Sequence, residues 1–378
     1  MKIGILFPLS NVYPSVGFDF LDGLNTLLKD KEQAGNVTIL KEAVGFGGEE
    51  KDSYQKAQKL LISDDVDVLI AYLDEKVVSI LNPLVQATGK LMIVVNPGAN
   101  YPANWIAQPT VIRLNLQHAF LCSLTGALAA ANGNGQAALA TTYYDCGYLH
   151  AAAMVNHFME AGGEIKYNYV NNQAYNESFE IASLLNFLSA TPGCKNLLCV
   201  FDKLPAALFG KLLNEYKANE PLHLFASPMM LQQFMENSGA AHVYDVTGYL
   251  PWYTDLKNEA NRYFQNKLKN PATLFSLLGW ETGMIINEVL QHFNDDSSNG
   301  EQVIQYLKNK PLDGPRGKMK LDDETQFYIA PVTKIDLKAG DIAPVITEGI
   351  NAEAEWKSFS SKPIEGTVTG WTNTYLCY

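Results

Sequence analysis

Charged side chains directly follow two short apolar stretches that are typical of β-strands. Asp74, Glu75 and Lys76 come after LIAYL, and Asp202 and Lys203 come after LLCVF. Because open α/β sheets bind ligands at the carboxyl ends of their strands, we expect these groups to face a bound molecule. A carboxylate in such a place accepts hydrogen bonds from an ammonium group, or it caps the helix that follows. The pattern predicts binding chemistry, with helix capping as the alternative for Asp74 and Asp202.

Two further apolar stretches, Lys2–Phe7 and Lys90–Val95, run into loops that contain Pro, Gly, Asn and Ser. Such loops offer free backbone N–H groups and polar side chains at the edge of a sheet. In the second loop, Gly98 and Ala99 can donate from the backbone and Asn100 from its side chain. An ordinary Pro-Gly turn is the alternative, since this dipeptide is common in loops.

The motifs of the common enzyme classes are missing from the sequence. There is no GxSxG, HExxH or GxxxxGK[ST] pattern, and the histidines show no metal-ligand spacing. Gly133, Gly135 and Ala138 spell GxGxxA, but they precede a predicted strand, whereas a nucleotide-binding loop follows one. We therefore expect no enzyme and no cofactor. A dispersed acid–base pair of Asp74 and Asp202 is the enzymatic alternative.

Length and charge narrow the function classes. With 378 residues and 47% apolar residues, the chain is long enough for two lobes with separate cores. The net charge of −12 disfavours nucleic acid as a partner. The chain has only three arginines (Arg113, Arg262 and Arg316), so few guanidinium groups can hold a phosphate or carboxylate. The sequence therefore predicts a small ligand that is not a polyanion.

The cysteines and the amino terminus bear on the compartment. Free or buried thiols are predicted, because five scattered cysteines form neither a dense disulfide framework nor a CxxC site; they are Cys122, Cys146, Cys194, Cys199 and Cys377. A bridge between Cys194 and Cys199 in an oxidising compartment is the alternative. No run of about 18 apolar residues occurs. If the protein is exported, we expect its leader to have been removed.

Strands and helices are predicted to alternate in two rounds. In the first round, strands are predicted at 2–7, 37–43, 66–72 and 90–95, with helices at 17–31, 52–63 and 76–88. In the second, strands are predicted at 136–141, 164–170, 196–201 and 222–226, with helices at 117–131, 148–161, 178–190 and 204–218. This alternation predicts the α/β class: two doubly wound parallel-sheet lobes with helices on both faces.

The last third of the chain is less regular. A strand is predicted at 244–252 and another at 327–336, with helices at 256–269, 274–293 and 301–309 and a hairpin after GPRG at 314–317. The tail from Leu337 shows no clear periodicity. Helices without intervening strands suggest a return to an existing lobe. We expect three crossings between the lobes.

Several segments together resemble a known family. They are KIGILFPLSNVYPSVGFDFLDGLNTLL, LIAYLDEKVVSILNPLVQATGKLMIVVNPGAN, VIRLNLQ and GPRGKMKLDD, in this order along the chain. Up to about residue 336 the sequence resembles type I periplasmic binding proteins, in particular the leucine/isoleucine/valine-binding class of ABC-transporter receptors.

This resemblance implies a function as well as a fold. One lobe would comprise residues 1–116 and 250–328 and the other 117–249 and 329–378, with a small-molecule ligand in a cleft that closes by hinge motion. It also implies an ABC permease as partner, a monomer, and a periplasmic or membrane-anchored extracytoplasmic location. A ligand-sensing regulatory subunit of the same fold is the alternative.

The resemblance assigns site residues position by position. Gly98, Ala99 and Asn100 match the family loop that binds the ligand carboxylate, and Asp202 stands where a ligand-touching tyrosine is usual. Cys146 replaces an aromatic residue, so Tyr144 or Tyr148 would supply the ring.

A glutamate that binds the α-ammonium group in amino-acid receptors is missing from this chain. Its place is taken by the segment from Ala226 to Met230. Asp74, Glu75 or Asp202 would have to replace it, or the ligand lacks that charge. An apolar pocket is expected from Met229 and from the aromatic residues Tyr13, Tyr101, Trp252 and Phe275, with packing in the core as the alternative.

Overall fold

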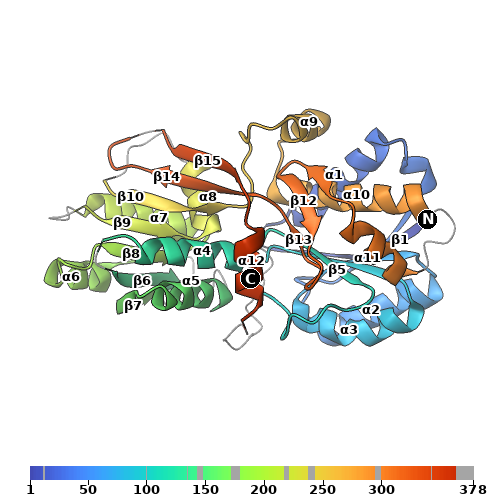
Figure 1. The fold of residues 1–378 in the computed structure, drawn as a ribbon, viewed down its shortest axis with the longest axis horizontal. Helices are drawn as coiled ribbons and strands as arrows, with labels where there is room; N and C mark the ends of the chain where they lie inside the picture. Colours follow the sequence, from blue (N-terminus) through green and yellow to red (C-terminus); the bar gives the residue numbers. More distant parts are fainter. Residues whose placement is uncertain are drawn as a thin grey trace. The chain divides into compact units, whose positions relative to one another are not determined.

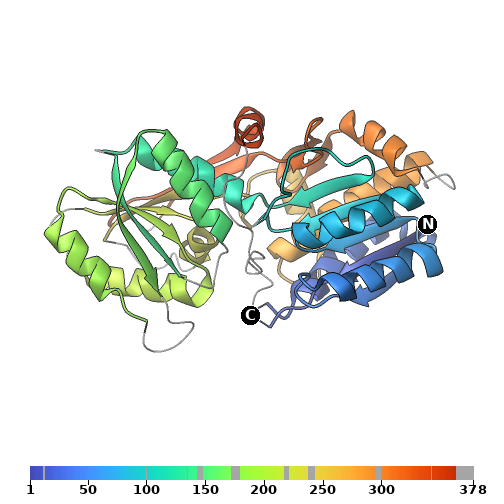
Figure 2. The same ribbon diagram turned by 90° about the horizontal axis from the view of Figure 1, so that it is seen from below.

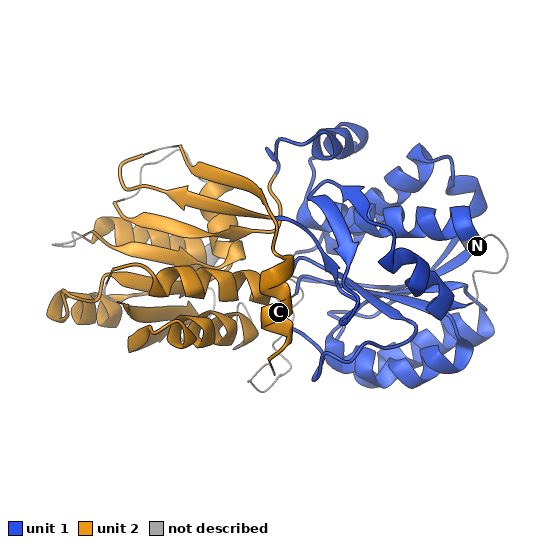
Figure 3. Cartoon of the chain, viewed as in Figure 1, with its two compact units in different colours: residues 1–116, 254–331, 375–378 blue, residues 117–253, 332–374 orange. Residues whose placement is uncertain are grey.

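The computed structural model describes most of the chain and divides it into two compact units. The described residues are 1–11, 13–98, 100–133, 135–142, 148–171, 179–216, 221–236, 243–293, 299–341 and 343–362. Unit 1 comprises residues 1–116 and 254–331, and unit 2 comprises 117–253 and the described residues from Val332 onward (Figure 3). Within the described ranges the chain passes between the units after Leu116, Tyr253 and Pro331.

Unit 1 contains a five-stranded parallel sheet in the order β2-β1-β3-β4-β5. Its strands are β1 Lys2–Phe7, β2 Thr38–Ala43, β3 Val68–Tyr72, β4 Leu91–Asn96 and β5 Val111–Asn115. The three strands β3, β4 and β5 are buried throughout, as expected of central parallel strands covered on both faces. The first four strands were predicted, whereas β5 was not, because its charged Arg113 interrupts the apolar run.

Helices cover both faces of the unit 1 sheet (Figures 1 and 2). Helices α2 (Glu50–Gln58) and α3 (Glu75–Thr88) pack on one face around Leu69, Ala71 and Val94. A π-helical turn, Lys59–Ser63, follows α2. Helix α1 (Val16–Asp30) packs against α10 (Leu274–Phe293). The ring of Phe20 on α1 lies 5.8 Å from that of Tyr72, so α1 covers the opposite face.

Unit 1 is completed by the second segment of its chain. It adds α9 (Glu259–Lys267), α11 (Gly300–Lys308) and a small antiparallel sheet of β11 (Leu312–Gly314), β12 (Gly317–Leu321) and β13 (Tyr328–Ile329). GPRG forms the turn between β11 and β12, because Gly314 pairs with Gly317. The hairpin predicted after this turn is confirmed by β12 and β13, in which Leu321 pairs with Tyr328. Between Gly314 and Gly317, Arg316 binds Glu281 in a buried ion pair of 2.6 Å.

Unit 2 contains a seven-stranded sheet in the order β15-β14-β10-β9-β8-β6-β7. Its parallel strands are β6 Gln136–Thr142, β7 Glu164–Asn171, β8 Asn196–Val200, β9 His223–Ala226 and β10 Asp245–Leu250. Strands β14 (Val332–Leu337) and β15 (Val345–Ile350) extend it antiparallel. Together with unit 1, this arrangement confirms the predicted α/β class with doubly wound parallel sheets.

The helices of unit 2 also lie on both faces of its sheet (Figure 1). They are α4 (His118–Ala130), α5 (Tyr148–Glu160), α6 (Ala182–Ala190), α7 (Lys203–Glu215), α8 (Pro228–Glu236) and α12 (Glu353–Ser360). Helix α4 packs on α5, and α7 packs on α8. A Cβ at Gly126 of α4 would lie 2.1 Å from the Met154 carbonyl oxygen of α5, so the close approach of these two helices requires glycine there.

Two local predictions need correction, and one helix was not predicted. The strand predicted at 327–336 is two strands, β13 in unit 1 and β14 in unit 2, because Pro331 between them lacks an N–H and breaks the ladder. Helix α8 has no counterpart among the predicted elements. The tail from Leu337, read as irregular, contains β15 and α12, and Trp356 of α12 is fully buried.

The described cysteines are thiols. Cys122, Cys194 and Cys199 are buried and free, so the alternative of a bridge between the last two is not what the structure shows. Burial raises the pKa of Cys194 to about 11, which keeps it protonated at neutral pH. Cys146 and Cys377 lie outside the described residues. No helix in the described ranges has the length and apolar character needed to cross a bilayer.

Candidate functional site

In unit 1, the predicted residues Asp74 and Asn100 are brought together at the carboxyl edge of the sheet. Asp74 is the N-cap of α3, and its Oδ1 accepts a hydrogen bond from the Lys76 N–H at 2.9 Å. Its Oδ2 accepts a second hydrogen bond, from Asn100 Nδ2 at 3.1 Å. Both side chains are buried. The alternative of helix capping is therefore confirmed for Asp74, and the same carboxylate ties the loop after β3 to the loop after β4.

The loop after β4 folds on itself. Asn96 Oδ1 accepts a hydrogen bond from the Gly98 N–H at 2.7 Å, and Gly98 has φ +75°, a conformation that favours glycine. At Gly98 the structure therefore shows the alternative interpretation, an ordinary Pro-Gly turn. Ala99 lies outside the described residues. Tyr101 packs against Trp105, with ring centroids 5.0 Å apart, and against Phe327 at 5.7 Å.

Glu75 takes part in a buried ion pair instead of facing a loop. Its two carboxylate oxygens accept hydrogen bonds from Arg113 Nε and Nη2, at 2.7 and 3.0 Å. Both side chains are 2% exposed, and the Arg113 guanidinium also lies over the Phe327 ring. In a bidentate pair of this kind the guanidinium neutralises the carboxylate and fixes its orientation. We therefore leave Glu75 out of the proposed ligand site.

Two aromatic residues of unit 1 also meet. Tyr13, in the loop after β1, lies edge-on to Phe275 at the start of α10, with ring centroids 5.7 Å apart. Tyr13 is half-buried and Phe275 is buried. The pair joins the loop after β1 to the second segment of unit 1, and the partial exposure of Tyr13 leaves part of it accessible.

In unit 2, Asp202 stands at the corresponding edge of the sheet. It follows β8, holds the N-cap position of α7 and is 6% exposed. Its backbone oxygen accepts a hydrogen bond from the Ala206 N–H at 3.3 Å, but its side chain makes no capping hydrogen bond. Helix capping therefore does not explain the carboxylate of Asp202, in contrast to Asp74.

Met229 lies in the first turn of α8, directly after β9, and contacts a histidine that the sequence did not single out. Its sulfur is 3.3 Å from Nδ1 of His118, the first residue of α4. The ring of His118 is 6.0 Å from that of His150 in the first turn of α5. All three side chains are buried. No sequence spacing links residues 118, 150 and 229, so only the packing of α4, α5 and α8 reveals this cluster.

The remaining predicted residues of unit 2 are only partly described. Tyr148 begins α5, while Tyr144 and Cys146 lie outside the described ranges. Trp252 is buried, which supports the alternative of packing in the core. Within the part of the chain that the structure describes, no group of three or more His, Cys, Asp or Glu residues could hold a metal ion.

Comparison with known proteins identifies the family. The model of a family described as periplasmic binding protein matches residues 1–341. No curated protein sequence gives a significant match.

Solved structures provide a second comparison. The chain is similar to a solute-binding protein of an ABC transporter from R. palustris in complex with benzoate, with 20% identity, coverage of 93% and 99% of the two chains, and a TM-score of 0.68. An ABC transporter substrate-binding protein from Sphaerobacter thermophilus gives 16% identity, coverage of 93% and 98%, and a TM-score of 0.75. A leucine-binding protein from Thermotoga maritima gives 14%, coverage of 94% and 99%, and 0.65. These similarities show a shared fold.

The family match extends over most of both units, and the predicted polar and aromatic residues that the structure describes lie at the carboxyl edges of the two parallel sheets or beside them. The chain belongs to the periplasmic binding protein family.

Proposed function

We propose that this protein is an extracytoplasmic solute-binding receptor that captures a small molecule and delivers it to an ABC permease. The observation that carries the proposal is the family match over residues 1–341. The polar groups that follow β3 and β4 in unit 1 and β8 in unit 2 support it, because open α/β sheets bind ligands at these edges. We further propose that the receptor acts as a monomer and not as an enzyme.

The ligand we propose is an aromatic carboxylate, with a zwitterionic amino acid as the alternative. Structural neighbours were crystallised with benzoate and 4-hydroxybenzoate, and another is a leucine-binding protein. In this chain the segment from Ala226 to Met230, which includes Met229, stands where the resemblance places the glutamate for an α-ammonium group. Met229 contacts His118 and is buried. An apolar thioether favours a ring over an ammonium group at this position.

Ligand capture in this proposal uses both units. Asn100 and Tyr13 would contact the ligand from unit 1, with Asp74 holding the Asn100 amide. Met229 and Asp202 would contact it from unit 2, where the Asp202 carboxylate can accept a hydrogen bond from a ring hydroxyl. A ligand that contacts both edges stabilises only the closed arrangement, by the difference between its contacts in the closed and open states. Closure would then report occupancy to the permease.

A titration calorimetry series tests the proposal. The purified chain is titrated with benzoate, 4-hydroxybenzoate and leucine, and each variant Asn100→Ala and Asp202→Ala is titrated with the best ligand. We expect saturable binding of one aromatic acid with one site per chain, weakened by both variants. Binding of leucine alone would support the amino-acid alternative. Absence of binding to all three compounds would argue against the proposed ligand classes.

A further inference from the structure

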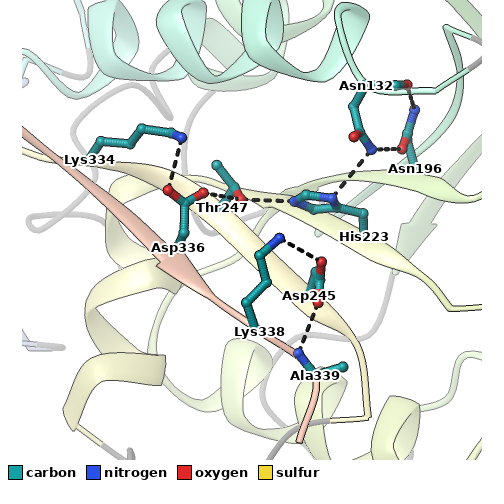
Figure 4. A network of polar contacts seen from close by, with 9 residues as sticks. All are labelled: Asn132, Asn196, His223, Asp245, Thr247, Lys334, Asp336, Lys338 and Ala339. Atoms are coloured by element: carbon teal, nitrogen blue, oxygen red, sulfur yellow. Dashed lines mark hydrogen bonds and ion pairs between the residues drawn. The ribbon is translucent and has the colours of Figure 1, made fainter. Parts of the chain in front are cut away.

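A network of polar side chains lies at the amino end of the unit 2 sheet, opposite the edge described above (Figure 4). Asn196 and His223 begin the adjacent strands β8 and β9, and Asn132 lies in the turn between α4 and β6. Thr247 of β10 and Asp336 of β14 complete the network. One imidazole thus joins the α4–β6 turn to strands β9, β10 and β14.

The hydrogen bonds of this network determine which nitrogen of His223 carries the proton. Thr247 Oγ1 donates its only hydrogen to Asp336 Oδ1 at 2.8 Å, so it must accept from His223 Nε2, also at 2.8 Å. Asn132 Nδ2 donates to Asn196 Oδ1 at 2.9 Å and is 3.3 Å from His223 Nδ1. An amide nitrogen only donates, so Nδ1 must accept.

The network therefore fits only a neutral His223 with its proton on Nε2. A proton on Nδ1 would turn the contact with Asn132 into two opposed donors. The orientation of the Asn196 amide is fixed as well, because Asn196 Nδ2 donates to the backbone carbonyl oxygen of Asn132 at 3.0 Å, which leaves Asn196 Oδ1 facing Asn132 Nδ2. The Asn132 amide therefore cannot relieve the conflict by exchanging its oxygen and nitrogen without losing its bond to Asn196.

Charged groups beside β8, at the start of β10, and on or just after β14 lie near His223. Asp245 at the start of β10 binds Lys338 Nζ at 2.9 Å, and Asp336 binds Lys334 Nζ at 2.8 Å. Lys195, beside β8, lines the same cavity as His223. Each carboxylate is thus already paired with a lysine, which weakens its attraction for an imidazolium.

The ring is shielded but reachable by protons. It stacks on Phe225 with centroids 4.3 Å apart and an interplanar angle of 12°. A cavity of about 410 Å³, lined in part by Asn132, Lys195 and Asp245, borders it. Solvent in this cavity gives protons access to the network.

We propose that His223 is a pH-sensitive latch: the neutral ring fastens the α4–β6 turn to β9 through Asn132, and protonation of Nδ1 breaks this contact while the hydrogen bonds between Asn132 and Asn196 remain. The proposal rests on the donor and acceptor pattern of the network and is independent of the ligand that the protein binds.

The electrostatic surroundings of His223 favour its neutral form, as the latch requires. Burial lowers the pKa of His223 below its ordinary value of 6.5; Asp245 and Asp336 act against this effect, and Lys338 and Lys334 act with it. As the pH falls below 6.5, the unfolded chain binds a proton more readily than the folded one. The contribution of the latch to stability is therefore complete above pH 6.5 and is lost as the pH falls through the folded-state pKa.

Histidine-selective ¹H–¹⁵N spectra of the full chain between pH 5 and 8 test the latch directly. We expect His223 to be neutral at pH 7.5 with its proton on Nε2, and to titrate below pH 6.5, with the side-chain NH₂ signals of Asn132 shifting at the same pH. A proton on Nδ1 at pH 7.5, or a midpoint at or above pH 6.5, would overturn the proposal.

Two variants test the latch in addition to the spectra of the wild-type chain. His223→Gln should reduce the fall in melting temperature between pH 7.5 and 5.0. Asn132→Asp retains His223 and places an acceptor opposite Nδ1, so the titration midpoint of His223 should rise. An unchanged midpoint in Asn132→Asp, or an unchanged pH dependence in His223→Gln, would also refute the latch.

Discussion

At the scale of single residues, Asp74 combines two tasks. Its carboxylate caps α3 and holds the Asn100 amide, so two loops at one sheet edge are fixed relative to each other by one side chain. Preorganised polar groups lose less entropy when a ligand binds. This arrangement makes Asn100 a better probe of the proposed site than Asp74, whose removal would also disturb a helix.

We predict that Asn100→Ala weakens ligand binding by about 1–3 kcal/mol, because a buried hydrogen-bonding group is lost at the proposed site. Titration calorimetry measures the change. Asn104→Ala is the matched control in the same loop, since Asn104 is exposed and accepts from the Ile106 N–H within the loop. Equal affinities of the wild-type protein and Asn100→Ala would show that Asn100 serves the loop alone.

A second prediction at the residue scale concerns the hydroxyl of Tyr72. Its side chain is fully buried at the end of β3, and its hydroxyl has no hydrogen-bond partner among the described residues. Tyr72→Phe removes a desolvated hydroxyl and should raise the free energy of unfolding by about 1–3 kcal/mol. Urea unfolding measures this change.

The control for Tyr72→Phe is the same substitution at Tyr244, whose hydroxyl makes a hydrogen bond. The Tyr244 hydroxyl donates to the Gly210 carbonyl oxygen at 3.1 Å, so Tyr244→Phe should lower the free energy of unfolding by about 1 kcal/mol. If Tyr72→Phe also lowers it, the hydroxyl of Tyr72 makes a stabilising contact and the prediction is wrong.

The candidate site could be predicted from sequence only where the signal is local. Capping by Asp74 follows from its position before an amphipathic helix. The partner of Glu75 does not, because Arg113 lies 38 residues away on the strand that was missed. The cluster of His118, His150 and Met229 is set by helix packing, which leaves no spacing in the sequence.

At the scale of elements, the contact between α1 and α10 depends on glycine. A Cβ at Gly279 would lie 1.9 Å from the Phe20 carbonyl oxygen, and a Cβ at Gly23 would lie 2.0 Å from that of Ser276. The two glycines face each other's helices, so each backbone packs directly on the other. This contact joins the first and second segments of unit 1.

We predict that Gly279→Ala destabilises the protein by about 1–3 kcal/mol, although alanine is the better helix former by about 1 kcal/mol. Overlap with backbone atoms outweighs the gain in helix propensity. Gly35→Ala is the control, because a Cβ there meets nothing within 4 Å, and it should change stability by less than about 0.5 kcal/mol. A Gly279→Ala variant as stable as the wild type in urea unfolding would contradict the close contact.

The fold was more predictable than the site because buried parallel strands produce continuous apolar runs. Strands β1, β3 and β4 were predicted from such apolar runs. The signal failed where charge or backbone chemistry interrupted it: Arg113 concealed β5, and Pro331 divides a stretch that otherwise reads as one strand. In the tail, β15 alternates between half-buried and exposed residues. Such an edge strand has little apolar signal.

At the scale of the whole molecule, the distribution of charge limits the ligand. Two of the three arginines, Arg113 and Arg316, form buried bidentate pairs with Glu75 and Glu281. They stabilise unit 1, so a ligand carboxylate would have to be held by other donors, such as the Asn100 amide in the proposed site. With a net charge of −12, the protein suits a small ligand of low charge better than a polyanion.

The central claim is that this chain is a receptor whose two units bind one small molecule together, and titration calorimetry with aromatic acids and amino acids tests it most directly. The account predicts saturable binding of one compound with one site per chain, weakened both by Asn100→Ala in unit 1 and by Asp202→Ala in unit 2. Binding that only one of the two variants weakens would contradict it.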